Sequence, residues 1–99
     1  MKTLRLRLGV RVPNEGARLL AQWIMREPLG TLDKLLRKIG MGQIDMERMM
    51  AGELTPAASV GHQIFAFTRC AVTINDWYRP ATGGWFDTVA ETATMRRAA

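Results

Sequence analysis

The sequence is poor in residues that build disulfides and metal sites, because its 99 residues include one cysteine, Cys70, and one histidine, His62. A single chain therefore cannot form a disulfide, nor a zinc site with four cysteine and histidine ligands. A lone cysteine is typical of reducing compartments, so we expect a cytoplasmic protein. Neither a metal nor a cofactor is predicted.

Long apolar runs are also missing, since no stretch approaches the roughly 20 residues that a membrane helix needs. The N-terminus alternates arginine with leucine, unlike the continuous apolar core of a signal peptide. We therefore expect no membrane contact. The sequence contains no glycine-rich phosphate loop, paired carboxylate site or nucleophile triad, so an enzyme is not expected.

Positive charge exceeds negative charge, with 14 Lys and Arg against 9 Asp and Glu, which gives +5 at pH 7. This balance suits a polyanionic partner such as nucleic acid, but a merely soluble basic protein has it too. Apolar residues make up 47% of the chain, enough for one modest core. The length and composition therefore predict a single domain.

Residues 1–12 are predicted to form a basic β-strand, because apolar residues recur at every second position with arginines between them. The strand could pair with its copy in a second protomer, contact DNA phosphates, or pack on its own domain. An edge strand without a partner favours pairing in a homodimer. The predicted dimer interface is Leu4, Leu6, Leu8 and Val10. The predicted phosphate contacts of this arm are Arg5, Arg7 and Arg11.

Residues 13–80 are predicted to contain five helices. The first runs from Asn14, a good N-cap, to about Glu27, with apolar residues at helical spacing. Thr31 is expected to cap the second helix. Thr55 and Pro56 are start signals for the fourth, which should close the core with an apolar stripe and carry a surface His62 and a buried Cys70. The stripe comprises Val60, Ile64, Phe67 and Ala71.

Residues 35–56 predict two short helices joined by a tight turn at Gly40. Apolar stripes at Leu35, Leu36 and Ile39, and then at Met46, Met49 and Met50, have the spacing of buried helix faces. This stretch resembles the helix-turn-helix of Cro and the lambda-type phage repressors. The matching positions are Ile39, Gly40, Met41, Gln43, Met46, Arg48, Met49, Gly52 and Pro56. Further matches at Val72, Thr73, Asp76 and Trp77 close the domain, where Thr73 and Asp76 also predict a capping box.

The resemblance implies a mainly α fold, a lambda-repressor-like five-helix domain over residues 13–80, preceded by the strand and followed by a C-terminal tail at 81–99. It also implies a transcriptional regulator, of phage repressor or antitoxin type, that binds a two-fold operator in double-stranded DNA as a homodimer. The helix Gly42 to Ala51 would enter the major groove. Side-chain chemistry then predicts base reading by Gln43, Ile44, Glu47 and Arg48. Further predicted phosphate contacts are Lys34, Lys38 and Thr55.

A second interpretation keeps the fold but makes it a protein-protein interaction module without specific DNA binding. Asp45 and Glu47 would bring negative charge near phosphates, and Ile44 is apolar where the family commonly has a polar residue. The recognition helix has no net positive charge, so attraction to DNA must come from elsewhere, with the arginines of the arm as the leading candidates. In the tail, Trp85 and Phe86 are expected to pack on the domain or on a partner protein.

Overall fold

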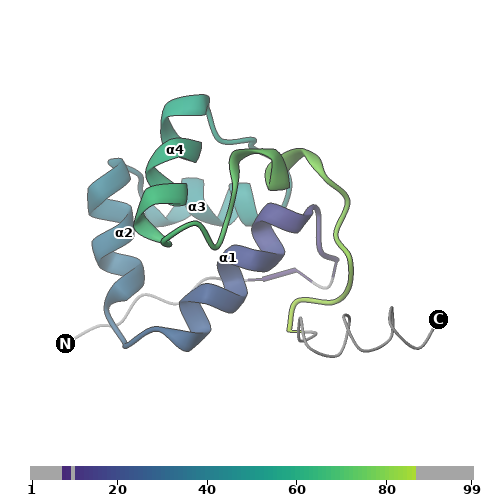
Figure 1. The fold of residues 1–99 in the computed structure, drawn as a ribbon, viewed down its shortest axis with the longest axis horizontal. Helices are drawn as coiled ribbons and strands as arrows, with labels where there is room; N and C mark the ends of the chain where they lie inside the picture. The colour runs from purple at the N-terminus through teal and green to yellow at the C-terminus, as the bar shows by residue number, and fades with distance from the viewer. Residues whose placement is uncertain (1–7, 10, 87–99) are drawn as a thin grey trace.

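The computed structural model describes residues 8, 9 and 11–86, and this part of the chain is mainly helical (Figure 1). The elements in order are α1 (Glu15–Arg26), α2 (Thr31–Ile39), α3 (Gln43–Met50), α4 (Ala58–Phe67) and a 3-10 helix, η1 (Ile74–Tyr78). None of the described residues lies in a β-strand. The predicted mainly α class is confirmed. Within the same residues, no helix is both long and apolar enough to cross a membrane.

The predicted N-terminal strand falls mostly outside the described residues. Leu8, Gly9 and residues 11–14 adopt no regular secondary structure. Leu8 packs, half-buried, against the core of its own domain. Pro13 lies against Gly52, where an added Cβ would come within 2.6 Å of the proline Cβ. Gly52 also has a φ of 82°, so glycine is required there for two independent reasons. Pairing of the strand in a dimer stays a prediction.

Helix α1 begins where the sequence predicts, because the Asn14 side chain accepts a hydrogen bond from Ala17 N at 2.8 Å. Its predicted apolar face is confirmed, since Ala17, Leu20 and Ala21 are buried. Trp23 is buried beside them. Its ring meets Phe67 of α4 edge-on, with centroids 5.7 Å apart. The helix therefore contributes one side to the core.

Helix α2 begins one residue earlier than predicted, since its N-cap is Gly30 in the left-handed conformation and not Thr31. The Thr31 hydroxyl instead donates to Pro28 O at 2.7 Å and stabilises the preceding turn. The predicted reversal at Gly40 is confirmed by its left-handed φ of 68°. Met41 N then donates to Leu36 O at 3.0 Å and closes the helix end. Gly40, Met41 and Gly42 connect α2 to α3.

The core lies between the helices. Met46, Met49 and Met50 of α3 are fully buried, as their spacing predicts, together with Leu35 of α2 and Ile64 of α4. Helix α1 packs against η1 and α3, whereas α2 and η1 pack against α4. In Figure 1, α2 and α4 stand side by side, α1 crosses in front, and α3 lies behind. One face of every helix thus points into a single core.

Helix α4 differs from the prediction at both ends. Its N-cap is Ala57, so Thr55 does not cap it, and the buried Pro56 packs in the loop instead of opening the helix. At the other end the helix stops at Phe67, and the chain turns through Cys70 with a left-handed φ of 70°. Cys70 therefore lies beyond the helix and is exposed, which corrects the predicted buried thiol. His62 is exposed as predicted.

The short helix η1 begins with the predicted capping box. Thr73 N donates to Asp76 Oδ2 at 2.8 Å, and the Thr73 side chain accepts from the amide of Asp76. Trp77 follows and is buried directly over Gly16 of α1, where an added Cβ would overlap the indole ring. The absence of a side chain at Gly16 therefore lets η1 approach α1 closely.

Candidate nucleic-acid interface

Helix α3 is anchored by its three buried methionines, and its opposite side faces solvent. Gly42, in an extended conformation, begins the helix without a side-chain cap. Ile44 is 75% exposed. Of the other predicted base-reading residues, Arg48 is exposed, and Gln43 and Glu47 are half-buried. The structure therefore brings the four predicted readers onto one accessible helix.

Polar contacts on this helix join each of two predicted readers to a carboxylate. Arg48 Nη1 lies 3.7 Å from Asp45 Oδ1, and both side chains are more than half exposed. Gln43 Nε2 donates to Glu47 Oε2 at 3.4 Å. The Gln43–Glu47 bond is long, and the Arg48–Asp45 pair is both long and exposed, so neither contributes much to folding. The side chains can therefore exchange these partners for others at low energetic cost.

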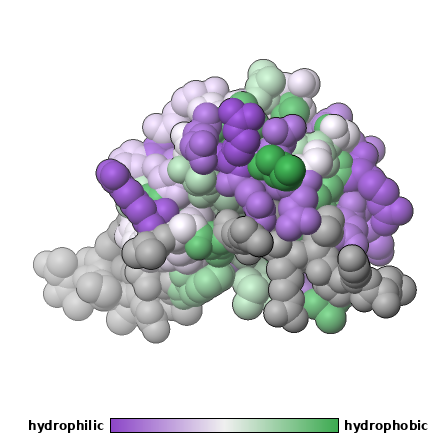
Figure 2. Space-filling model, turned by 180° about the vertical axis from the view of Figure 1, so that it is seen from behind, coloured by the Kyte–Doolittle hydropathy of each residue, from purple (hydrophilic) through white to green (hydrophobic). Residues whose placement is uncertain are grey.

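Figure 2 shows the side of the molecule on which α3 lies, opposite to the view of Figure 1. Hydrophilic residues cover much of the described surface, with hydrophobic atoms exposed among them. The helix itself carries two acids against one arginine, so its own charge is negative. Positive charge near a polyanion must come from neighbouring segments.

Helix α2 supplies cations directly before the turn into α3. Lys34, Arg37 and Lys38 are all exposed, and the four-residue spacing of the two lysines places them on one side of the helix. Thr55, another predicted phosphate contact, is exposed in the loop that follows α3. The predicted phosphate contacts of α2 and this loop are therefore accessible and flank α3 in sequence.

The N-terminal segment reaches the other end of α3. Arg11 is exposed and precedes Pro13, which contacts Gly52 just beyond the helix. Two residues of extended chain span at most about 7 Å, so Arg11 leaves the domain close to this end of α3. The remaining predicted residues of the arm lie outside the described residues. These are Leu4, Arg5, Leu6, Arg7 and Val10.

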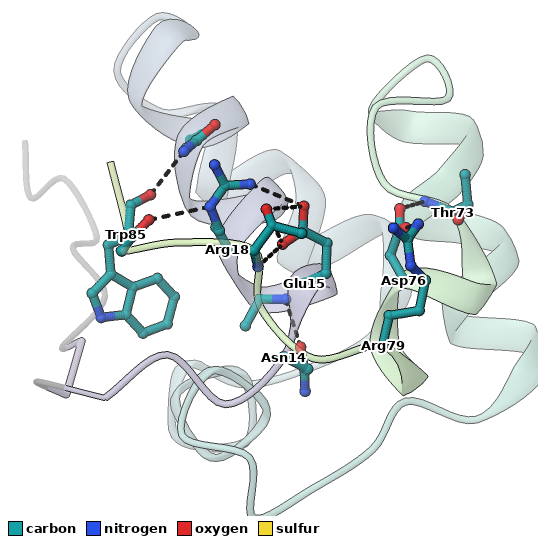
Figure 3. A network of polar contacts seen from close by, with 11 residues as sticks. Asn14, Glu15, Arg18, Thr73, Asp76, Arg79 and Trp85 are labelled. Atoms are coloured by element: carbon teal, nitrogen blue, oxygen red, sulfur yellow. Dashed lines mark hydrogen bonds and ion pairs between the residues drawn. The ribbon is translucent and has the colours of Figure 1, made fainter. Parts of the chain in front are cut away.

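A polar network on α1 was not predicted from the sequence (Figure 3). Arg18 Nη1 and Glu15 Oε2 form a buried ion pair at 2.9 Å. The same carboxylate accepts from Thr82 N at 2.9 Å, and Arg18 Nε donates to Gly84 O at 3.2 Å. The only sequence signal was an acid and an arginine three residues apart. The C-terminal residues that complete the network are distant in sequence and could not be matched to it.

The described residues hold no group of three histidine, cysteine or acidic side chains placed to bind a metal ion. Comparisons with protein-family models, curated proteins and solved structures gave no match to this chain.

Proposed function

We propose that the protein is a sequence-specific DNA-binding regulator that uses α2, the turn Gly40 to Gly42 and α3 as a helix-turn-helix. One observation carries the proposal. Directly after a glycine-closed turn, α3 buries three methionines on one side and presents hydrogen-bonding side chains on the other. In this motif the second helix enters the major groove and the first crosses the backbone. The length and exposure of α3 suit that task.

The exposed chemistry of α3 fits base edges. The Gln43 amide can pair with adenine N6 and N7, and the Arg48 guanidinium can pair with guanine O6 and N7. The exposed methyl groups of Ile44 suit a thymine methyl, and Glu47 can accept from cytosine N4. Good bidentate contacts discriminate against a wrong base by about 1–3 kcal/mol each. Two bidentate contacts, together with the contacts of Ile44 and Glu47, could therefore define a short half-site.

Phosphate contacts would come from the segments that flank α3. Lys34 and Lys38 are exposed on α2, Thr55 is exposed after α3, and Arg11 is exposed near the helix end. Neutralising phosphates releases counterions, so binding should weaken as salt increases. These contacts would compensate for the negative charge of α3 itself. Arg5 and Arg7 of the same arm would add to them.

We further propose that the functional unit is a cytoplasmic homodimer on a two-fold operator. The half-sites would then lie about one helical turn apart, roughly 34 Å. Pairing of residues 1–12 across the two-fold axis would supply the dimer contact through alternating apolar side chains. Such a dimer would act by occupying an operator, as phage repressors and antitoxins do. Sedimentation of a protein lacking residues 1–12 should then show monomers, and an intact dimer would remove this role.

A mobility-shift titration tests the DNA-binding proposal. The DNA should come from the promoter region of the protein's own gene, with a scrambled duplex as competitor, at two salt concentrations. Gln43→Ala and Arg48→Ala should abolish the preference for promoter DNA while circular dichroism stays unchanged. Gln63→Ala on α4 and Arg26→Ala at the end of α1 are matched controls, since both side chains are exposed. Unchanged binding by the two α3 variants would contradict the assignment of the reading helix.

One observation favours a second candidate, a protein-interaction module. The face of α3 combines two carboxylates with an Ile44 that is 75% exposed, a combination that suits a protein groove with a basic rim. This candidate predicts no shift of any duplex at low salt. It also predicts that Ile44→Ser, and not Arg48→Ala, removes the interaction with the partner.

A further inference from the structure

Residues 82–85 are fastened to one side of α1 by hydrogen bonds with side chains of that helix (Figure 3). The Thr82 hydroxyl donates to Glu15 at 3.1 Å, in addition to the bond from its amide. Arg18 binds the carbonyl of Gly84, and Gln22 Nε2 donates to Trp85 O at 3.0 Å. Glu15, Arg18 and Gln22 lie on one side of α1, at spacings of three and four residues. They hold an extended segment along the helix.

Trp85 extends this attachment to the N-terminal segment. Its ring packs, half-buried, against the core, and its indole Nε1 donates to Gly9 O at 2.7 Å. Gln22 holds the backbone of Trp85, and the side chain of Trp85 in turn holds the backbone of Gly9. A residue close to the C-terminal end of the described chain is thereby connected to a residue close to its start.

Two fixed points therefore bracket the exposed Arg11. Gly9 is held by Trp85 on one side, and Pro13 is held against Gly52 at the end of α3 on the other. Arg7 and Arg5 precede Gly9 by two and four residues in the sequence. Anchoring a segment near its target lowers the conformational entropy that binding must remove.

We propose that Trp85 is a positioning residue for DNA binding: its indole N–H clamps Gly9 and thereby fixes the described base of the basic arm, which carries Arg11, beside the end of α3. This inference rests on the proposed function and adds a role that α3 alone does not give. The C-terminal segment acts on DNA affinity without touching DNA. Its effect should pass entirely through the arginines of the arm.

The first test needs no DNA. Trp85→Phe keeps an aromatic ring for packing and removes the indole N–H. Limited trypsin digestion of the full chain, followed by mass spectrometry, should show cleavage after Arg11 accelerated about two- to tenfold, the equivalent of one net hydrogen bond. Phe86→Leu, at a neighbouring exposed position, should leave the rate unchanged. Equal cleavage of Trp85→Phe and the unaltered protein would overturn the clamp.

The second test couples the clamp to DNA affinity. Trp85→Phe should weaken binding to promoter DNA about two- to tenfold and lower the slope of affinity against salt. In a protein that already carries Arg5→Ala, Arg7→Ala and Arg11→Ala, the same substitution should have no effect. Such a double-mutant cycle separates action through the arm from a general disturbance of the domain. Equal weakening in both backgrounds would overturn the positioning role.

Two further outcomes separate this inference from the proposed function. Promoter binding by the unaltered protein together with unchanged binding by Trp85→Phe would overturn the inference alone. Absence of promoter binding by the unaltered protein at both salt concentrations would overturn the proposed function, and this inference with it. Should Trp85→Phe lower the melting temperature, Gln22→Met interrupts the same chain of contacts one step earlier and must show the same dependence on the arm arginines.

Discussion

The ion pairs Glu15–Arg18 and Asp45–Arg48 have the same spacing along a helix but lie in opposite surroundings. In α1 the charged atoms are 2.9 Å apart, and the side chains are 8% and 2% exposed. In α3 the distance is 3.7 Å, and the exposures are 55% and 52%. Asp76 and Arg79 form a third pair at 3.1 Å, in which the carboxylate is buried and the guanidinium is exposed.

The two pairs distinguish a region whose charges stabilise the fold, in α1, from a region whose charges are exposed to a ligand, in α3. The buried pair has additional hydrogen-bond partners in Thr82 and Gly84, so its charges are compensated by groups that belong to the fold. The exposed pair is solvated and screened, and such pairs typically contribute about 0–1 kcal/mol. Helix α1 therefore uses its charges to hold the chain together, whereas α3 can offer Arg48 to a ligand.

Removing the buried cation should have the largest effect on stability. Arg18→Ala leaves the Glu15 carboxylate of α1 buried without its cation, and it also removes the donor to Gly84. We expect the free energy of unfolding to fall by about 3–5 kcal/mol, measured by urea denaturation. The matched substitution Arg48→Ala should change it by less than about 1 kcal/mol. Similar losses in both variants would break the distinction between the two regions.

A side chain added at Gly16 should have the next largest effect on stability. Gly16 follows Glu15 of the buried pair and packs under Trp77. A Cβ at this position overlaps the Trp77 ring, so Gly16→Ala must displace η1 or α1. Such overpacking typically lowers stability by about 1–3 kcal/mol. Gly61→Ala is the control, because its Cβ would be 3.4 Å from Ile74 Cγ1 and a helical alanine is favoured by up to about 1 kcal/mol. Equal thermal melting shifts in the two variants would contradict the close approach of α1 and η1.

The intermediate pair in η1 allows a finer test. Asp76 accepts from Thr73 N at 2.8 Å as well as from Arg79, so its buried carboxylate depends on the capping box more than on the exposed cation. Thr73→Ala keeps the backbone N–H that binds Asp76 but removes the side chain that accepts from the Asp76 amide, so it should lower the free energy of unfolding by about 1 kcal/mol. Arg79→Ala should lower it less, because the guanidinium is mostly exposed. A larger loss for Arg79→Ala in urea denaturation would reverse this ranking.

Local patterns in the sequence were sufficient to predict much of the helical structure. The cap at Asn14, the reversal at Gly40, the methionine stripe and the capping box at Thr73 depend on neighbouring residues, and all four are confirmed. The predicted burial of Cys70 is wrong because α4 stops at Phe67, and helical spacing no longer determines burial beyond the last turn. The predicted N-caps at Thr31 and Thr55 are wrong because cap propensity identifies a helix start only to within a few residues.

The candidate site was predictable in part for the same reason. Burial of Met46, Met49 and Met50 follows from helical spacing, and it fixes which side of α3 faces solvent. Sequence spacing could not distinguish the buried pair in α1 from the exposed pair in α3, because both have an acid three residues before an arginine. Burial of Arg18 depends on residues 82–85, which only the folded chain brings to α1. Contacts between such distant segments leave no local pattern.

Asp45→Asn should change stability least, and its effect on DNA affinity is the most informative. Asp45→Asn removes the charge that pairs with Arg48 and shortens no side chain, so the free energy of unfolding should change by less than about 1 kcal/mol. If α3 meets DNA, the substitution releases Arg48 and removes repulsion from phosphates, and affinity at low salt should rise. Glu53→Gln, which removes an exposed acid just beyond α3, controls for net charge.

A rise in affinity with Asp45→Asn that exceeds the rise with Glu53→Gln would place the effect at Arg48, whereas equal rises would mean that only the total charge of the protein matters. A loss of affinity would mean that the Asp45 carboxylate orients Arg48 in the complex, and the exposed pair would then be part of the recognition surface and not an exchangeable contact.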